Sequence, residues 1–305
     1  MTIGPTGEPF DELAVLREAA AESGVPWPGD PVLARREVEV APGRRLSAIV
    51  WGDDERPATV LLHGGQQNAH TWDLVALAYG RPALAVDLAG HGSSDPVDRP
   101  FDTAAQADDL AVALGELAAS PAVVAGMSLG GLSAITLAAV HPDLVARLVV
   151  VDVTPGVVHG RRNNEEMFGL TRVESFDTFE DMVEAVVRAN PRSSPSSLRR
   201  GLRYNARQRP DGRWAWRFSW GSEEPGEGAA AVAPFASVWD DLAAVTCPVT
   251  LVTGSRSAVV TDEDRAAFRA RQPAARMVVV EGAGHSVQGS RPVELARLLR
   301  DPGPA

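Results

Sequence analysis

The hexapeptide GMSLGG, residues 126–131, joins a short apolar run to a helical pattern over 129–140. A G-x-S-x-G sequence between a buried strand and a helix predicts a sharp turn that lifts the serine hydroxyl clear of the sheet. Side chains at Gly126 and Gly130 would collide with neighbouring backbone in so tight a turn. Ser128 is therefore a candidate nucleophile. The alternative is a Gly-rich turn in which Ser128 only caps the helix.

The segments around this turn alternate between short apolar runs and helical patterns. Strands that are apolar on both faces, with helices between them, are typical of a mostly parallel sheet covered on both sides. A hairpin over 36–51 precedes the first run, and an amphipathic helix over 10–22 precedes the hairpin. The runs are ATVLL (58–62), PALAVDL (82–88), AVVAGM (122–127), ARLVVVDV (146–153), PVTLVTG (248–254) and RMVVVEG (276–282), with helices expected near 72–79, 103–119, 129–140, 261–271 and 290–300. We therefore expect an α/β fold.

The segment from residue 155 to residue 243 contains no such strand run. It holds a helical piece (178–189), a Ser/Pro/Arg stretch (190–200), and an Asp211-Gly212 turn that leads into aromatic residues. Roughly ninety residues is too long for a plain loop in a compact domain. We predict an N-terminal helical extension (1–30), an α/β core (31–154 and 244–305), and an inserted, mainly helical lid (155–243) over the carboxyl ends of the strands.

Composition excludes several classes of function. The formal net charge of −11 provides no basic surface for nucleic acid or anionic lipid. The single cysteine, Cys247, fits a reducing compartment and stands in an apolar run, which indicates a packed thiol. The N-terminus lacks the pattern of a signal peptide, and no run approaches a membrane span. We expect a soluble cytoplasmic protein with no nucleic-acid or membrane partner, and the sequence leaves a homodimer open.

The stretch LLHGGQQNAHTW (61–72) follows the first of the apolar runs. A His-Gly-Gly turn at this place would bring the backbone N–H of Gly65 toward Ser128. Together with the N–H of Leu129 it would form a two-donor oxyanion hole. We expect His63 to be structural and bonded within its own loop. Four further polar residues of this loop are candidates for a pocket wall or for solvated positions: Gln66, Gln67, Asn68 and His70.

His285 stands in the Gly-rich loop VEGAGHSVQG that follows the last apolar run. Flanking glycines allow an imidazole to reach a neighbouring site without steric obstruction. A lone histidine is usually structural or at the surface. A histidine at the end of the last strand, with Ser128 upstream, is instead a candidate general base.

The pieces HGG, DLAGHGSSD (87–95), GMSLGG and GAGHS, in this order over residues 40 to 300, resemble the α/β-hydrolase superfamily. The similarity is greatest to its lid-bearing branch of esterases, lactonases and carbon–carbon bond hydrolases. It implies the α/β-hydrolase fold and a Ser–acid–His order along the chain. It also implies that Asp87 and His91 stabilise their loop.

The acid of the triad does not stand at its usual place. In the resembled family it follows the strand after the lid, near Arg256, where this chain reads GSRSAVV. Asp262, Glu263 and Asp264 come next, but Thr261 with Asp264 forms a variant of a capping box, and acids in a first helical turn favour the helix dipole without catalysis.

Asp152, at the end of the strand run ARLVVVDV, is the competing candidate for the acid. It belongs to the same carboxyl edge of the sheet as Ser128 and His285. Any carboxylate that reaches the far ring nitrogen can orient the imidazole and stabilise the imidazolium. An Asp before Pro-Gly is also a common turn residue. We favour Asp152 as the acid over Asp262 and Asp264.

The resemblance therefore predicts a serine hydrolase with no cofactor and no metal. Its substrate would be a carboxylic ester or lactone of a hydrophobic small molecule, cleaved through an acyl-enzyme on Ser128, His285 and Asp152. Carbon–carbon bond hydrolysis of a diketone on the same triad and a non-catalytic ligand receptor are the alternatives. Five tryptophans are candidates for the lid side of the pocket, or for a small core within the lid: Trp72, Trp214, Trp216, Trp220 and Trp239.

Overall fold

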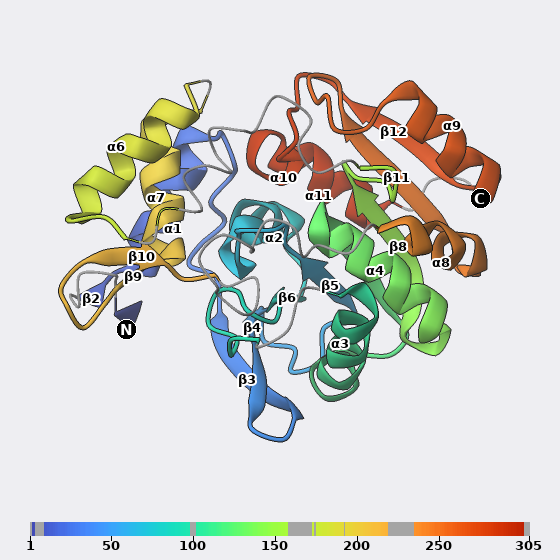
Figure 1. Cartoon of the computed structure of the whole chain (residues 1–305), viewed down its shortest axis with the longest axis horizontal. Coiled ribbons are helices and arrows are strands. Elements are labelled where there is room, and N and C mark those ends of the chain that lie inside the picture. The colour runs from blue at the N-terminus through green and yellow to red at the C-terminus, as the bar shows by residue number, and fades with distance from the viewer. Residues whose placement is uncertain are drawn as a thin grey trace.

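An eight-stranded sheet forms the centre of the molecule (Figure 1). The computed structural model describes residues 2–3, 9–97, 102–157, 173, 175–191, 193–218 and 235–301. The strands lie in the order β12-β11-β8-β7-β5-β6-β4-β3. All neighbours from β12 to β6 pair in parallel, while β4 runs antiparallel to both β6 and β3. The strands are β3 (Leu33–Ala41), β4 (Arg44–Trp51), β5 (Thr59–Leu62), β6 (Ala83–Asp87), β7 (Ala122–Met127), β8 (Val145–Val151), β11 (Val249–Gly254) and β12 (Arg276–Val280).

The parallel strands are apolar because helices cover both of their faces. Every residue of β5, β6 and β11 is buried, whereas the edge strand β12 keeps Val279 59% exposed. The predicted hairpin and all six predicted strand runs are present, which confirms the α/β fold class. Because the strands are parallel, the residues that follow β7, β8, β11 and β12 meet at one edge of the sheet.

Helices divide between the two faces of the sheet. One hydrophobic cluster joins the sheet to α3, α4, α8 and α9, and a second joins it to α1, α2, α10 and α11. The helix predicted near 290–300 is present as α11, and a separate short helix, α10, precedes it with Arg291 at the junction. The helices are α1 (Glu12–Glu22), α2 (Asp73–Tyr79), α3 (Thr103–Leu117), α4 (Leu129–Val140), α8 (Val238–Ala244), α9 (Asp262–Arg271), α10 (Val287–Ser290) and α11 (Pro292–Arg300), with short 3-10 turns at Ala69–Trp72, Pro142–Leu144 and Phe235–Ser237.

A separate group of elements lies between β8 and α8 in the chain. It consists of α6 (Phe179–Ala189), α7 (Pro195–Asn205) and a hairpin of β9 (Ala206–Gln208) and β10 (Trp214–Trp216). These elements, called the insertion below, share their own hydrophobic cluster and contribute no strand to the main sheet. Figure 1 shows them gathered beside α1, away from α8, α9 and β12.

Two helices differ from what we expected from the sequence. We expected α8 within the lid, yet Val238 and Leu242 are fully buried in the cluster that contains α4. The Ser/Pro/Arg stretch carries α7, because Ser194 caps a helix that starts with Pro195. Two further short segments, β1 (Thr2–Ile3) and β2 (Pro9–Phe10), pair as a small ribbon near the N-terminus.

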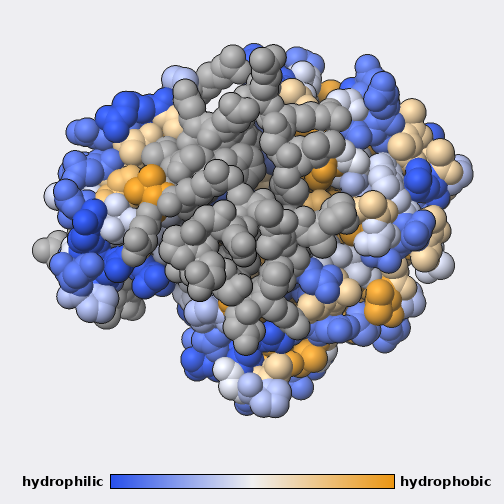
Figure 2. All heavy atoms as spheres, in the orientation of Figure 1, coloured by the Kyte–Doolittle hydropathy of each residue, from blue (hydrophilic) through white to orange (hydrophobic). Residues whose placement is uncertain are grey.

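The face seen in Figure 2 is largely hydrophilic outside the grey atoms, and its hydrophobic residues form scattered spots. No helix among the described residues combines the length and the apolar character needed to span a membrane.

Candidate active site

Ser128 lies at the turn between β7 and α4 in a strained backbone conformation. Its φ and ψ angles are 50° and −118°, which place a residue other than glycine at positive φ. The Ser128 N–H donates to the carbonyl of Val151 at 3.0 Å, and the Ser128 carbonyl accepts from the N–H groups of Gly131 and Leu132. The predicted strand–turn–helix is thus present, and it places a partly exposed Ser128 at the carboxyl edge of the sheet.

The glycines of this turn are required by contact. A Cβ atom on Gly126 would lie 2.2 Å from the carbonyl oxygen of Gly130. A Cβ atom on Gly130 would lie 2.5 Å from the carbonyl oxygens of Leu62 and His63. Larger residues would therefore push α4 away from β7 and from the loop after β5.

Asp152 directly follows β8 and is fully buried. Its φ angle is 53°, a second strained position among residues other than glycine. The Oδ1 atom accepts a hydrogen bond from the N–H of Gly254 at 3.0 Å. The Oδ2 atom accepts from the Ser257 hydroxyl at 2.5 Å and from Nδ1 of His285 at 2.7 Å. These three donors offset the cost of burying a carboxylate.

Two of the three donors to Asp152 come from the segment where the resemblance would place the acid itself. Gly254 ends β11, and Ser257 follows three residues later. Arg256 between them is exposed, and its N–H donates to the carbonyl of Ala283 at 2.9 Å. This segment therefore holds a carboxylate that comes from the neighbouring strand. Sequence reasoning did not identify Gly254 or Ser257, because their role depends on the β8–β11 pairing.

His285 lies in the loop after β12, close against the end of β11. A Cβ atom on Gly254 would lie 2.5 Å from the carbonyl oxygens of Ala283 and Gly284, so a glycine there lets the loop approach. Nδ1 of His285 is bonded to Asp152, while Nε2 has no hydrogen-bond partner among the described residues. The side chain is 32% exposed. The imidazole is thus oriented from one side and open on the other.

The competing acids serve the start of α9. Asp262 is 96% exposed at its side chain and pairs with Arg265. Oδ2 of Asp264 accepts from both the N–H and the hydroxyl of Thr261, which completes the predicted capping box. The structure brings Asp152 to His285, and it brings neither Asp262 nor Asp264 there.

The His-Gly-Gly loop lies against the serine turn. A Cβ atom on Gly64 would lie 3.3 Å from Cβ of Ser128. The Gly64 N–H donates to Oε1 of Gln67 at 3.1 Å, and the Gln66 N–H donates to Nε2 of His91 at 3.2 Å. The N–H of Gly65, between these two, has no partner among the described residues. Leu129 begins α4, so its N–H is one that no carbonyl of the helix satisfies.

His63 and His91 are each bonded through both ring nitrogens. Nδ1 of His63 donates to the carbonyl of Gly64 at 2.7 Å, and Nε2 accepts from the N–H of Leu88 at 2.9 Å. Nδ1 of His91 donates to the carbonyl of Ala89 at 3.1 Å. Burial lowers the pKa of His63, and it lowers the pKa of His91 to about 3. The predicted structural roles of these two histidines are confirmed.

The polar residues after the His-Gly-Gly turn contact the insertion and α10. Nδ2 of Asn68 donates to Oδ1 of Asn205 at 2.5 Å. The ring of His70 stacks on Tyr204 with a centroid distance of 3.7 Å. Gln288, which sequence reasoning did not identify, is fully buried and donates to the hydroxyl of Thr71 at 3.2 Å. The loop is thereby attached to α7 and to the helix that follows His285.

The tryptophans are mostly structural. Trp214 and Trp216 pack in the hydrophobic cluster of the insertion, as expected for a small core of its own. Trp72 is fully buried in the cluster that contains α2 and α11. Trp239 packs against the cluster on the other face of the sheet, and the Arg271 guanidinium lies over its ring. Trp220 lies outside the described residues.

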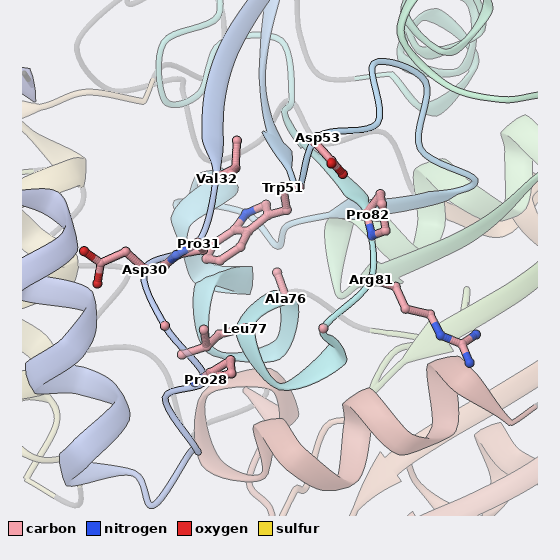
Figure 3. A pocket seen from close by; sticks show the side chains of 13 residues that line it. Pro28, Asp30, Pro31, Val32, Trp51, Asp53, Ala76, Leu77, Arg81 and Pro82 are labelled. Atoms are coloured by element: carbon pink, nitrogen blue, oxygen red, sulfur yellow. The ribbon is translucent and has the colours of Figure 1, made fainter.

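A pocket of about 330 Å³ lies at the opposite edge of the sheet, beside the end of β4 and the start of β6 (Figure 3). The Trp51 indole crosses it, and apolar side chains such as Leu77 and Pro82 line it. Figure 3 shows Asp30 and Arg81 directed away from its centre, and Asp30 is paired with Arg17. No charged group converges there, and the pocket is remote from Ser128.

A second reactive centre is not visible in the described part of the chain. Cys247 is partly buried, and burial raises the pKa of its thiol. No three His, Cys, Asp or Glu side chains of the described residues gather closely enough to hold a metal ion.

The chain is similar to known hydrolases in both sequence and fold. The family model described as the alpha/beta hydrolase family matches residues 59–298. The esterase Rv0045c of Mycobacterium tuberculosis is 40% identical over 298 residues, which cover 95% of this chain and 95% of that protein. Its crystal structure superposes with a TM-score of 0.79 over 96% of this chain and 98% of that chain, at 40% identity. The lipase LipV of the same organism is 32% identical over 256 residues, 80% of this chain and 92% of that protein. The chain therefore belongs to the alpha/beta hydrolase family, in its esterase branch.

Proposed function

We propose that this enzyme hydrolyses a carboxylic ester or lactone of a hydrophobic small molecule through an acyl-enzyme on Ser128. The observation that carries the proposal is the hydrogen bond of 2.7 Å between Nδ1 of His285 and the buried carboxylate of Asp152, at the sheet edge that presents Ser128. A histidine whose Nδ1–H is held by a carboxylate has Nε2 free to accept a proton.

In the first half of the reaction, Nε2 of His285 takes the hydroxyl proton of Ser128 while the oxygen attacks the ester carbonyl. Asp152 stabilises the imidazolium that results. The tetrahedral intermediate collapses when the carbon–oxygen bond to the alcohol breaks, and His285 gives its proton to that alcohol. His285 then takes a proton from water as the water oxygen attacks the acyl carbon; the bond to Ser128 breaks, His285 returns the proton to the Ser128 oxygen, and the acid is released. A lactone yields its alcohol and acid in one molecule.

The N–H groups of Gly65 and Leu129 are the proposed oxyanion hole. The N–H groups of the residues before and after Gly65 are already bonded: that of Gly64 to Gln67, and that of Gln66 to His91. These two hydrogen bonds hold the loop and thereby set the direction of the Gly65 N–H. Such preorganised donors stabilise the negative charge of the tetrahedral intermediate without reorganising.

The apolar residues around the turn support a hydrophobic substrate. Met127 and Leu129 flank Ser128 and are buried. On the side of the insertion, the ring of Phe218 stacks on His91 with a centroid distance of 6.0 Å, beside the proposed oxyanion loop. We propose that the insertion acts as the lid of the site.

A fluorophosphonate probe tests the proposal. We expect one mass label, at Ser128, and loss of both the label and ester hydrolysis in Ser128→Ala. A folded wild-type protein that takes no label, or a Ser128→Ala variant that hydrolyses p-nitrophenyl butyrate at the wild-type rate, would contradict it.

A further inference from the structure

The hairpin of the insertion lies next to the core where α7 ends. The N–H of Arg217, directly after β10, donates to the carbonyl of Asn205, the last residue of α7, at 2.7 Å. Asn205 is bonded to Asn68 of the core, so Arg217 lies beside a contact between the insertion and the core. Arg207 of the same hairpin is exposed, and its Nε atom donates to the carbonyl of Trp216.

Two neighbours of Arg217, Asn205 and Phe218, contact the core next to the His-Gly-Gly loop, which carries the proposed oxyanion donor. Asn205, the backbone partner of Arg217, holds Asn68, and Phe218 stacks on His91. His91 in turn accepts the N–H of Gln66, next to Gly65. The segment that carries Arg217 therefore lies beside the loop that holds Gly65, the proposed oxyanion donor.

The guanidinium of Arg217 has no anionic partner among the described residues. It is partly buried, its Nε atom is buried without a hydrogen-bond partner, and no described carboxylate forms an ion pair with it. Burial lowers the pKa of Arg217; Asp87 opposes this effect, and Arg35 and Arg207 add to it. A cation that is partly removed from water and repelled by two others favours a bound anion.

Asp87 cannot supply that anion, because other donors already occupy it. It is 1% exposed, its Oδ1 atom accepts from the N–H of Ala69 at 2.7 Å, and its Oδ2 atom accepts from Arg35 at 2.9 Å and from the N–H of Ser93 at 3.0 Å. Asp87 is thus already engaged, and the guanidinium groups of Arg35 and Arg207 lie close enough to Arg217 to repel it, in a chain whose formal net charge is −11.

We propose that Arg217, with Arg207 and Arg35 beside it, binds a carboxylate of the substrate, so that the preferred ester carries an acidic group remote from the bond that is cleaved. In such a substrate the part of the acyl chain next to Ser128 is apolar, and the far end of the chain carries the carboxylate. This inference rests on the proposed ester hydrolysis and names its substrate class. A guanidinium fork matches a carboxylate with two parallel hydrogen bonds, which makes Arg suited to this task.

The test compares charged and neutral esters of equal length. The p-nitrophenyl half-esters of glutaric, adipic and suberic acids are measured against p-nitrophenyl esters of the corresponding monocarboxylic acids, after subtraction of the enzyme-free rate. We expect kcat/KM for at least one half-ester to exceed that of its neutral counterpart by roughly tenfold or more. In Arg217→Gln we expect this ratio to fall to about one, mainly through KM, and 0.5 M NaCl to lower it in the wild type.

Arg213→Gln is the matched control. Arg213 is on the same hairpin, but it is exposed and paired with Asp177, so its loss should leave the ratio unchanged. The ratio is taken within each variant, and a general loss of folding therefore cancels. Neutral esters preferred at every length, or a preference that survives in Arg217→Gln, would overturn the inference. Ser128-dependent hydrolysis without charge preference would leave the proposed function standing, whereas hydrolysis independent of Ser128 would remove that function itself.

Discussion

Nδ1 of His285 lies 2.7 Å from Oδ2 of Asp152, although 133 residues separate the two in the chain. The same carboxylate oxygen accepts the hydroxyl of Ser257, and the other accepts the N–H of Gly254. Asp152 is thus held by the strand next to its own, and this arrangement orients the imidazole.

Asp152→Asn should lower kcat/KM on p-nitrophenyl butyrate by roughly 10³- to 10⁴-fold. The amide keeps the shape of the side chain but loses the charge that stabilises the imidazolium and selects its tautomer. Asp264→Asn is the control, because the hydrogen bonds of this carboxylate are those of the capping box of α9, and the change should cost no more than about 2 kcal/mol of stability at near wild-type activity. Steady-state kinetics with thermal unfolding measures both. Near wild-type activity in Asp152→Asn would refute the assignment of the acid.

Ser257→Ala should reduce kcat/KM by roughly tenfold, because the buried Asp152 carboxylate loses one of the donors that hold it against His285. Ser257→Thr should restore the rate, since it keeps the hydroxyl. Arg256→Ala should leave the rate unchanged, because the Arg256 side chain is exposed. A wild-type kcat/KM in Ser257→Ala would show that the hydroxyl is dispensable.

His91 should make the protein less stable in acid. Burial lowers its pKa from 6.5 to about 3, so between these values the unfolded chain binds a proton that the folded chain does not. The stability contributed by neutral His91 is complete above pH 6.5 and is lost as the pH falls, by up to about 1.4 kcal/mol per pH unit. Urea unfolding at several pH values should show a shallower dependence in His91→Gln than in the wild type. Equal slopes would argue against the buried neutral histidine.

Two glycine substitutions should have opposite effects. Gly126→Ala places a Cβ atom 2.2 Å from the backbone of Gly130 and should destabilise the fold by at least about 3 kcal/mol. Gly115→Ala, near the end of α3, meets no atom within 4 Å and should stabilise it by about 0.5–1 kcal/mol. Chemical denaturation of both variants checks the pair. A tolerated Gly126→Ala would mean that the serine turn is looser than the contacts imply.

Much of the fold was predictable because its signals are local. Unbroken apolar runs with helical patterns between them indicate a covered parallel sheet whatever the contacts are, and all six runs form strands. The position of α8 was harder to predict from the sequence, because its two buried residues can be assigned to the core only once α4 is known to pack against them. The capping box at Thr261 and Asp264 could be predicted, because both of its partners lie within one turn of the same helix.

Ser128 and His285 could be identified as candidates from local sequence, because a tight glycine turn and a Gly-rich loop after the last strand restrict the backbone through neighbouring residues alone. Which carboxylate reaches the imidazole depends on contacts between strands that are distant in the chain. Asp152 does so because β8 pairs with β11, which brings the N–H of Gly254 and the hydroxyl of Ser257 to a buried, strained residue. The stretch LVTGSRSAVV (251–260) carries no acid, and in the folded chain it provides the groups that hold one.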